Sequence, residues 1–171
     1  DQPVFFYVEF SQPFTYELID LAQRSRQEMT GNDLRGVFYF GRRRQGRQIL
    51  VKVGISAVSV EAARHNLLAE VDHWDFDRVH REARQSWNAE LNKIAVEMGG
   101  DDGDDNRQMT VFYTALYHTM IAPNTFMDVD RGYRGIDGRR HVAEDFSNYT
   151  VFSLWDTFRA LHPLLTITHR E

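Results

Sequence analysis

The 171 residues contain no cysteine. This absence excludes disulfide scaffolds, thiolate metal sites and cysteine nucleophiles, while it leaves the redox compartment open. Nor is there an apolar run near the roughly 20 residues that a membrane-spanning helix needs, or a basic N-terminal region followed by an apolar stretch. We therefore expect either a cytoplasmic protein or a signal upstream of residue 1, and a start inside a predicted strand favours the second.

An excess of positive charge is also missing, because 20 Lys and Arg stand against 25 Asp and Glu, a net charge of −5. A surface that follows phosphates needs clustered Lys and Arg, so nucleic acid is not an expected partner. The basic run at residues 41–47 lies between two strand-like segments and is interpreted as a solvated hairpin tip. With 42% hydrophobic residues, the composition predicts a globular chain with a packed core.

The N-terminal third has the pattern of antiparallel β-structure. β-Branched and aromatic residues dominate residues 4–10, 35–40 and 49–55, and the turn residues Gly31-Asn32-Asp33 separate two of these runs. Residues 18–30 are more polar and are predicted to form a loop.

After Ser59 the hydrophobic period becomes helical, with Ser59 as the predicted N-cap and Asp75 as the cap of a second helix. The apolar stripe of this second helix predicts a length of about 22 residues. Residues 99–106 are rich in Gly and Asp and predict an exposed loop. A third helix is expected from near Arg107 until Pro123 stops it. Its apolar face contains Met109, Phe112, Tyr113, Leu116 and Met120.

Strands followed by helices, without alternation, indicate an α+β chain rather than a parallel sheet. We predict the end of a β-domain at residues 1–57, a helical linker at residues 58–105 and the start of an α-domain at residues 106–171.

The last predicted helix, residues 149–166, separates into two arcs when it is projected at about 100° per residue. A packing arc contains Val151, Leu154, Phe158, Leu161 and Leu165. A second arc, which packing does not require, contains Tyr149, Phe152, Trp155, Asp156 and Arg159. Trp155, Asp156 and Arg159 combine a ring face with an acid and a base one turn apart, the set that binds a sugar ring and its hydroxyls. Spacing alone fits a helical salt bridge beside a core tryptophan better.

Other candidate sites carry weaker signals. His118 lies off the apolar face of its helix, so it either faces a cleft or is a hydrogen-bonded structural histidine. Residues 101–105 are acidic but lack the alternating ligands and closing Glu of an EF-hand loop. The other histidines show no metal-ligand spacing, and no residue is predicted to bind metal.

Residues 149–165, with the sequence YTVFSLWDTFRALHPLL, are similar to a signature of glycoside hydrolase family 92, the calcium-dependent exo-acting α-mannosidases. Further segments agree with this family in order and approximate distance, and the resemblance is strong from about Leu50 onward. These segments are VKVGIS at 51–56 with SVE at 59–61, HWDF at 73–76, and FYTALYHTM at 112–120 with APN at 122–124.

The resemblance implies an N-terminal antiparallel β-sandwich joined by helices to an (α/α)6 barrel, with the active site in the cleft between them. It implies removal of terminal α-mannose with inversion, by a general acid, a general base and calcium. The acid and base are expected beyond Glu171, as are most calcium ligands, so the chain alone is expected to be inactive. By position, Trp155, Asp156 and Arg159 are expected to line the mannose pocket and to orient hydroxyls, with His118 and Asp128 as weaker candidates.

One turn departs from the family. Where family members tend to have Asp-Gly-Arg-Tyr-Arg-Gly, residues 130–135 have the sequence DRGYRG. We expect the exchange to shift which residue takes a positive φ angle, which weakens a substrate role for Arg131. Asp128, Asp130 and Tyr133 remain candidates to approach the cleft, against the alternative that the turn is structural.

The leading hypothesis is thus part of an inverting, calcium-dependent exo-α-mannosidase, periplasmic or secreted, that acts on mannose-rich glycans through α-1,2 or related linkages. Two alternatives remain: a non-catalytic carbohydrate-binding module with a helical connector, and a structural helical adaptor. The sequence gives no indication of the oligomeric state.

Overall fold

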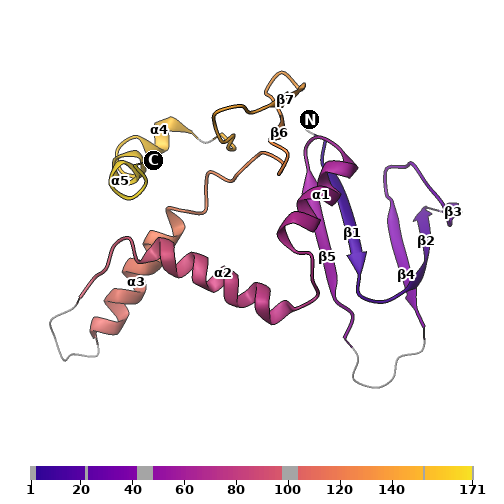
Figure 1. Cartoon of the computed structure of the whole chain (residues 1–171), viewed down its shortest axis with the longest axis horizontal. Coiled ribbons are helices and arrows are strands. Elements are labelled where there is room, and N and C mark those ends of the chain that lie inside the picture. Colours follow the sequence, from indigo (N-terminus) through magenta and orange to yellow (C-terminus); the bar gives the residue numbers. More distant parts are fainter. Residues whose placement is uncertain (1–2, 22, 42–47, 98–103, 152, 171) are drawn as a thin grey trace.

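The computed structural model describes residues 3–21, 23–41, 48–97, 104–151 and 153–170. Two small antiparallel sheets come first along the chain, and helices follow them, with one further two-stranded sheet between α3 and α4. Figure 1 shows the first two sheets gathered at one end, with α2 leading away from them toward the remaining helices. This order confirms a mixed α+β chain.

The first sheet pairs the two ends of the N-terminal third. Strand β1 (Phe5–Phe10) runs antiparallel to β5 (Val51–Ser56), with Phe5 opposite Ser56 and Phe10 opposite Val51. Strand β1 lies within the segment predicted at residues 4–10, and β5 extends one residue beyond the segment predicted at residues 49–55, so the local pattern was sufficient to find both.

The second sheet has the order β3-β2-β4, with β2 (Phe14–Asp20) between β3 (Gln23–Ser25) and β4 (Arg35–Phe40). The prediction of a loop at residues 18–30 is therefore wrong for the end of β2 and for β3. Cross-strand pairing to β4 and an ion pair between Arg24 and Glu17 at 3.1 Å support these strands. Such non-local partners are invisible to local propensity.

Strands β4 and β5 belong to different sheets. Residues 41–47 therefore connect two sheets, and the predicted hairpin tip is wrong because β4 pairs with β2 while β5 pairs with β1. Residues 42–47 of this basic run lie outside the described residues.

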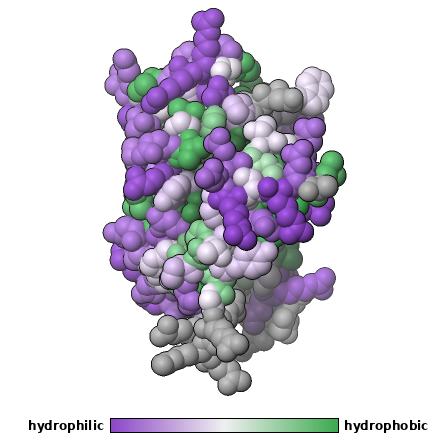
Figure 2. Space-filling view, turned by 90° about the vertical axis from the view of Figure 1, so that its right-hand side faces the viewer, coloured by the Kyte–Doolittle hydropathy of each residue, from purple (hydrophilic) through white to green (hydrophobic). Residues whose placement is uncertain are grey.

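An aromatic cluster joins the two sheets. The ring of Phe10 on β1 lies 4.9 Å from Phe14, 4.8 Å from Phe38 and 5.5 Å from Phe40, centroid to centroid. Such ring pairs stabilise by about 0.5–1.5 kcal/mol beyond their buried area. On the side of the molecule where the second sheet lies, hydrophobic side chains are scattered among hydrophilic ones (Figure 2).

Helix α1 (Val60–Glu70) packs directly on the first sheet. Its predicted N-cap is confirmed, because the Ser59 side chain accepts a hydrogen bond from the backbone N–H of Ala62 at 3.0 Å. A Cβ at Gly54 would collide with the Ala63 carbonyl oxygen and lie 2.8 Å from the Leu67 Cβ. Only a glycine permits this approach, so β5 and α1 contact each other backbone to backbone.

A buried lysine fixes the connection from α1 to the next helix. The Lys52 ammonium, whose side chain is 9% exposed, lies 3.2 Å from Glu9 and donates to the Val71 carbonyl at 3.0 Å. The same ammonium is 4.4 Å from the Trp74 ring centroid. Lys52 thus links Glu9 on the sheet to Val71 at the end of α1 and to the ring of Trp74.

Helix α2 (Phe76–Leu91) begins at the predicted cap, since the Asp75 carboxylate accepts from the Arg78 backbone N–H at 2.8 Å. It has 16 residues, so the predicted length of about 22 is wrong. Beyond the helix, the Tyr113 hydroxyl donates to the Ile94 carbonyl at 3.2 Å and accepts from the Val96 N–H at 3.3 Å. This tertiary contact holds the chain in a non-helical path.

Helix α3 (Asp104–His118) starts inside the loop predicted at residues 99–106, of which residues 99–103 lie outside the described residues. The predicted apolar face is its less exposed face, with Leu116 buried. Met120 follows the helix rather than belonging to it.

The prediction of one continuous helix over residues 149–166 is wrong. Tyr149 forms a β-bridge with Thr125, and helix α4 (Leu154–Thr157) is separate from α5 (Leu161–Thr168). In an unbroken helix, Pro163 could not donate a hydrogen bond to the Arg159 carbonyl because it has no N–H, and its ring would clash with that carbonyl. Within the first turn of α5 the missing N–H costs nothing.

The far end of α5 is tied to α2. The His169 ring nitrogen Nε2 lies 3.0 Å from Glu90, which also pairs with Lys93 at 2.6 Å. Lys93 first, and then His169, hold the pKa of Glu90 below its ordinary value.

Between α3 and α4, strands β6 (Gly132–Arg134) and β7 (Arg140–Val142) form a hairpin. The residue with a positive φ angle before this hairpin is Arg131, at +67°. The Asp-Arg-Gly order at residues 130–132 therefore does not move the positive φ angle onto Gly132. The Arg131 guanidinium donates to the carbonyl oxygens of Ala143, Glu144 and Phe146. These bonds offset the strain of a left-handed non-glycine residue.

The chain buries little of its apolar surface. It exposes 13,935 Å², whereas a compact monomer of 20.0 kDa exposes about 8,700 Å². Among the described residues the buried hydrophobic ones are Ala62, Ala63, Leu67, Leu116 and Ala143. The packed core predicted from composition is therefore not completed within these residues.

Replacing Gly54 with Ala should lower the free energy of unfolding by about 1–3 kcal/mol, because the methyl group forces α1 away from β5. Urea denaturation measures the change. Gly41→Ala is the matched control, since a Cβ there meets nothing within 4 Å. Equal stability of the two variants would contradict the close packing.

Arg131→Ala and Arg131→Gly both remove the guanidinium bonds, but only glycine adopts a φ of +67° without strain. We expect Arg131→Gly to be more stable than Arg131→Ala by about 1 kcal/mol in thermal denaturation. If the alanine variant proves the more stable one, Arg131 does not hold this conformation.

Candidate functional site

The three residues predicted to bind a sugar lie on and just after α4. Trp155 is 85% exposed, and Asp156 and Arg159 are also exposed. Asp156 and Arg159 form no ion pair with each other, and the guanidinium carbon lies 5.1 Å from the Phe158 ring centroid. The alternative of a salt bridge beside a core tryptophan is therefore wrong. Ring, acid and base remain available to a ligand.

The predicted packing arc is not a core face within the described residues. Val151 is 89% exposed, and Leu154 and Phe158 are exposed as well. The projection fails because residues 149–151 are not helical, so positions before Ser153 do not follow helical spacing. Phe152, assigned to the second arc, lies outside the described residues.

Helices α4 and α5 lie at the opposite end of the molecule from the two N-terminal sheets (Figure 1). His118, at the end of α3, is exposed with its ring centroid 5.7 Å from that of Tyr117. Among the described residues its side chain makes no hydrogen bond, so the interpretation as a hydrogen-bonded structural histidine finds no support.

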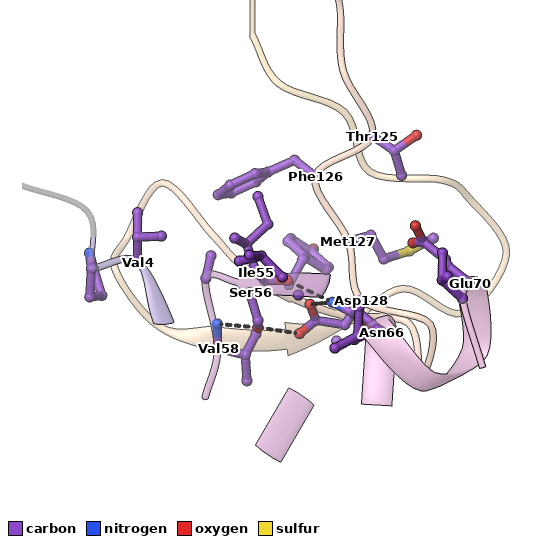
Figure 3. A pocket seen from close by; sticks show the side chains of 18 residues that line it. Val4, Ile55, Ser56, Val58, Asn66, Glu70, Thr125, Phe126, Met127 and Asp128 are labelled. Carbon is purple, nitrogen blue, oxygen red and sulfur yellow. Dashed lines mark hydrogen bonds between the residues drawn. The ribbon is translucent and has the colours of Figure 1, made fainter. Parts of the chain in front are cut away.

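Asp128 faces the sheet rather than α4. It is 6% exposed, and its carboxylate accepts hydrogen bonds from Ser56 Oγ at 2.8 Å and from Asn66 Nδ2 at 2.7 Å (Figure 3). Asn66 also donates to the Ile55 carbonyl at 2.9 Å and accepts from the Val129 N–H at 2.9 Å. Both carboxylate oxygens are thus engaged by protein donors, which leaves the carboxylate poorly suited to bind substrate directly.

A pocket of about 340 Å³ adjoins this carboxylate, near the lower end of the range for ligand sites. It lies between β5, α1 and the segment from Thr125 to Asp128, and apolar side chains dominate its wall (Figure 3). Trp155, Asp156 and Arg159 do not line it. The pocket is therefore a gap between the sheet and the connecting segment, separate from the predicted sugar residues.

The remaining candidates in the turn, Asp130 and Tyr133, contact other residues of the turn and hairpin. Asp130 accepts from the Gly132 N–H at 2.9 Å, and the Tyr133 ring lies between His141 at 5.5 Å and Phe146 at 5.9 Å. These contacts support the structural interpretation of the turn. At the hairpin tip, the Arg139 backbone N–H first, and then His141, hold the pKa of Asp137 below its ordinary value.

The structure offers no cage for a cation in the part of the chain that it describes, where no three His, Asp or Glu side chains gather. Calcium needs six to eight oxygen ligands. These residues therefore do not form the calcium site that the resemblance implies, and no chemical step is derived through it.

Sequence reasoning missed Ser56 and Asn66, the two partners of Asp128. Ser56 ended a recognised segment, and Asn66 lies on α1, yet Asp128 is 72 and 62 residues away from them. Each looks like an ordinary polar residue by itself. No local signal identifies a buried network whose members come from three separate elements.

Comparison with known proteins relates the chain to glycosidases. The sequence profile of the family described as the glycosyl hydrolase family 92 catalytic domain matches residues 62–171. A protein of Arthroderma benhamiae described as an uncharacterized secreted glycosidase is 31% identical over 81 residues, which are 46% of this chain and 10% of that protein.

The chain is similar in structure to solved α-mannosidases over nearly its whole length. The family GH92 α-mannosidase BT3965 from Bacteroides thetaiotaomicron is 31% identical with a TM-score of 0.81, over 95% of this chain and 22% of that one. The family GH92 inverting mannosidase BT2199 from the same species is 29% identical with a TM-score of 0.80, over 95% and 22%. The chain thus spans about a fifth of these relatives' length, and it belongs to glycoside hydrolase family 92.

Proposed function

We propose that this chain is part of an inverting exo-α-mannosidase that hydrolyses terminal α-mannose, through α-1,2 or related linkages, in mannose-rich glycans. The observation that carries the proposal is the exposed set Trp155, Asp156 and Arg159, in a chain whose relatives of known structure include α-mannosidases. A complex of BT3965 with mannoimidazole is among those structures.

The chemistry of the three side chains suits a hexose. The Trp155 ring face packs against the apolar C–H face of the sugar. The Asp156 carboxylate accepts hydrogen bonds from adjacent hydroxyls, and the Arg159 guanidinium donates to their oxygens. In this proposal Asp156 and Arg159 orient the sugar and transfer no proton.

The general acid and general base are proposed to come from parts of the protein outside these residues. An inverting pair stands about 6.5–9.5 Å apart so that a water molecule fits between the base and the sugar. Residues 1–57 are proposed to complete a β-sandwich, residues 58–105 to link it, and residues 106–171 to begin an (α/α)6 barrel. The large exposed surface supports this division, since the chain alone leaves many of its large apolar residues exposed. We expect the isolated chain to be inactive.

The proposed location is outside the cytoplasm, in the periplasm or beyond. The Arthroderma benhamiae relative is described as secreted, which supports this location. In the described part of the chain, none of the helices has the length and apolar character needed to cross a bilayer.

Asp156→Ala in the full-length enzyme should lower kcat/KM on an α-mannobioside by about 30-fold or more, equivalent to about 2 kcal/mol, because buried hydrogen bonds to the sugar are lost. Steady-state kinetics measures this loss. Asp145→Ala, at another exposed aspartate, is the control and should change little.

Unchanged hydrolysis by the Asp156→Ala enzyme would instead favour the structural-adaptor interpretation. A full-length protein that binds mannose yet hydrolyses no mannoside would favour the binding-module interpretation.

Hydrolysis by the full-length enzyme is also proposed to depend on calcium, supported by membership of the family. Chelation should abolish hydrolysis of linkage-defined mannobiosides, and added calcium should restore it. Activity that survives chelation would remove calcium from the proposal, while the role of Asp156 would stand.

A further inference from the structure

A buried hydrogen-bond network joins three parts of the chain that are distant in sequence. Asp128 belongs to the connecting segment, Ser56 ends β5 and Asn66 lies on α1. The Ser56 Oγ that donates to Asp128 also accepts from the Val58 N–H at 2.8 Å, so its orientation is fixed. The network therefore places the Asp128 backbone at a defined point on the β5 and α1 unit.

Further bonds hold the same segment in place. Asn66 Oδ1 accepts from the Val129 N–H at 2.9 Å, and the Arg134 guanidinium donates to the Ala57 carbonyl at 2.7 Å. The Asp128 N–H donates to the Gly132 carbonyl at 2.8 Å. Segment and hairpin thus dock on the sheet as one piece.

Upstream of Asp128, the segment is paired with the residues that lead into α4. The Phe126 N–H donates to the Asn148 carbonyl at 2.9 Å, and the Thr150 N–H donates to the Asn124 carbonyl at 2.8 Å. Thr150 Oγ1 accepts from the Asn124 N–H at 2.9 Å, and Asn148 Nδ2 donates to the Phe126 carbonyl at 2.8 Å. Four hydrogen bonds surround the β-bridge between Thr125 and Tyr149, so residues 124–126 and 148–150 are held in a fixed position relative to each other.

Thr150 lies three residues before Ser153, which is the N-cap of α4. Trp155 and Asp156 belong to this helix. Helix α4 is one turn long and exposed, so its own packing does little to fix it. Its entry point is set by the pairing with residues 124–126, and the position of that segment is set by Asp128.

We propose that Asp128 is a positioning residue that holds the sugar-recognition residues of α4 in register with β5 and α1, through Ser56 and Asn66 on one side and residues 124–126 on the other. The inference rests on the proposed function, because it assigns Asp128 an effect on sugar binding by Trp155 and Asp156. Asp128 itself does not contact the sugar.

A double-mutant cycle in the full-length enzyme tests this inference. Ser56→Ala removes one buried donor to Asp128 with little change in volume, and it is combined with Asp156→Ala. Asp128→Asn is a second variant that weakens the same network. Ser86→Ala is the control, since among the described residues the Ser86 hydroxyl bonds the Glu82 carbonyl within its own helix. The readouts are kcat, KM and the inhibition constant of free mannose.

We expect Ser56→Ala to raise KM and the mannose inhibition constant by about fivefold, the size of one lost buried hydrogen bond, with kcat changed less. In the Asp156→Ala background the same change should have less than half this effect, because the group being positioned is gone. Asp128→Asn should follow the same pattern, and Ser86→Ala should change neither quantity.

Two outcomes overturn the inference, and they are distinguishable. If Ser56→Ala lowers kcat with unchanged KM and mannose inhibition, or if its effect is fully additive with that of Asp156→Ala, the network is only structural and the proposed function stands. If Asp156→Ala alone changes nothing, the sugar-site assignment is wrong and the inference falls with it.

Discussion

The contact of α1 with Gly54 is the constraint on which the rest of the arrangement depends. Because residue 54 has no Cβ, the helix backbone approaches the strand backbone, and Ser56 and Asn66 come close enough to share one carboxylate. That carboxylate, on Asp128, fixes the connecting segment and the hairpin on the sheet. A larger residue at position 54 would separate the two donors and leave a buried charge without its partners, which is strongly unfavourable.

The described residues form an open structure with a small core. Phe10 joins the sheets, α1 covers one sheet face, and Leu154 and Trp155 of α4 are both exposed. An exposed surface well above that of a compact monomer means that the chain buries less surface than a compact protein of the same mass. This accords with a chain that spans about a fifth of the length of its structural relatives.

The errors of sequence reasoning about the candidate site have a common cause. Trp155, Asp156 and Arg159 were predicted from their chemistry, and the structure leaves all three exposed. Helical projection nevertheless failed before Ser153, because pairing with Thr125 extends the chain there. The role first considered for Asp128 also changed, since its oxygens are engaged by Ser56 and Asn66.

The amino-acid sequence by itself determined the α+β order, the strands β1, β4 and β5, the caps at Ser59 and Asp75, and the family, because these depend on local pattern and residue chemistry. Only the tertiary structure decided which strands pair, where α2 and the last helix end, and what Asp128 contacts. Each of these depends on partners tens of residues away, such as Tyr113 for the end of α2 and Ser56 for Asp128. Hydrogen bonds formed across such separations outweigh local propensity, and no short window of sequence contains both partners.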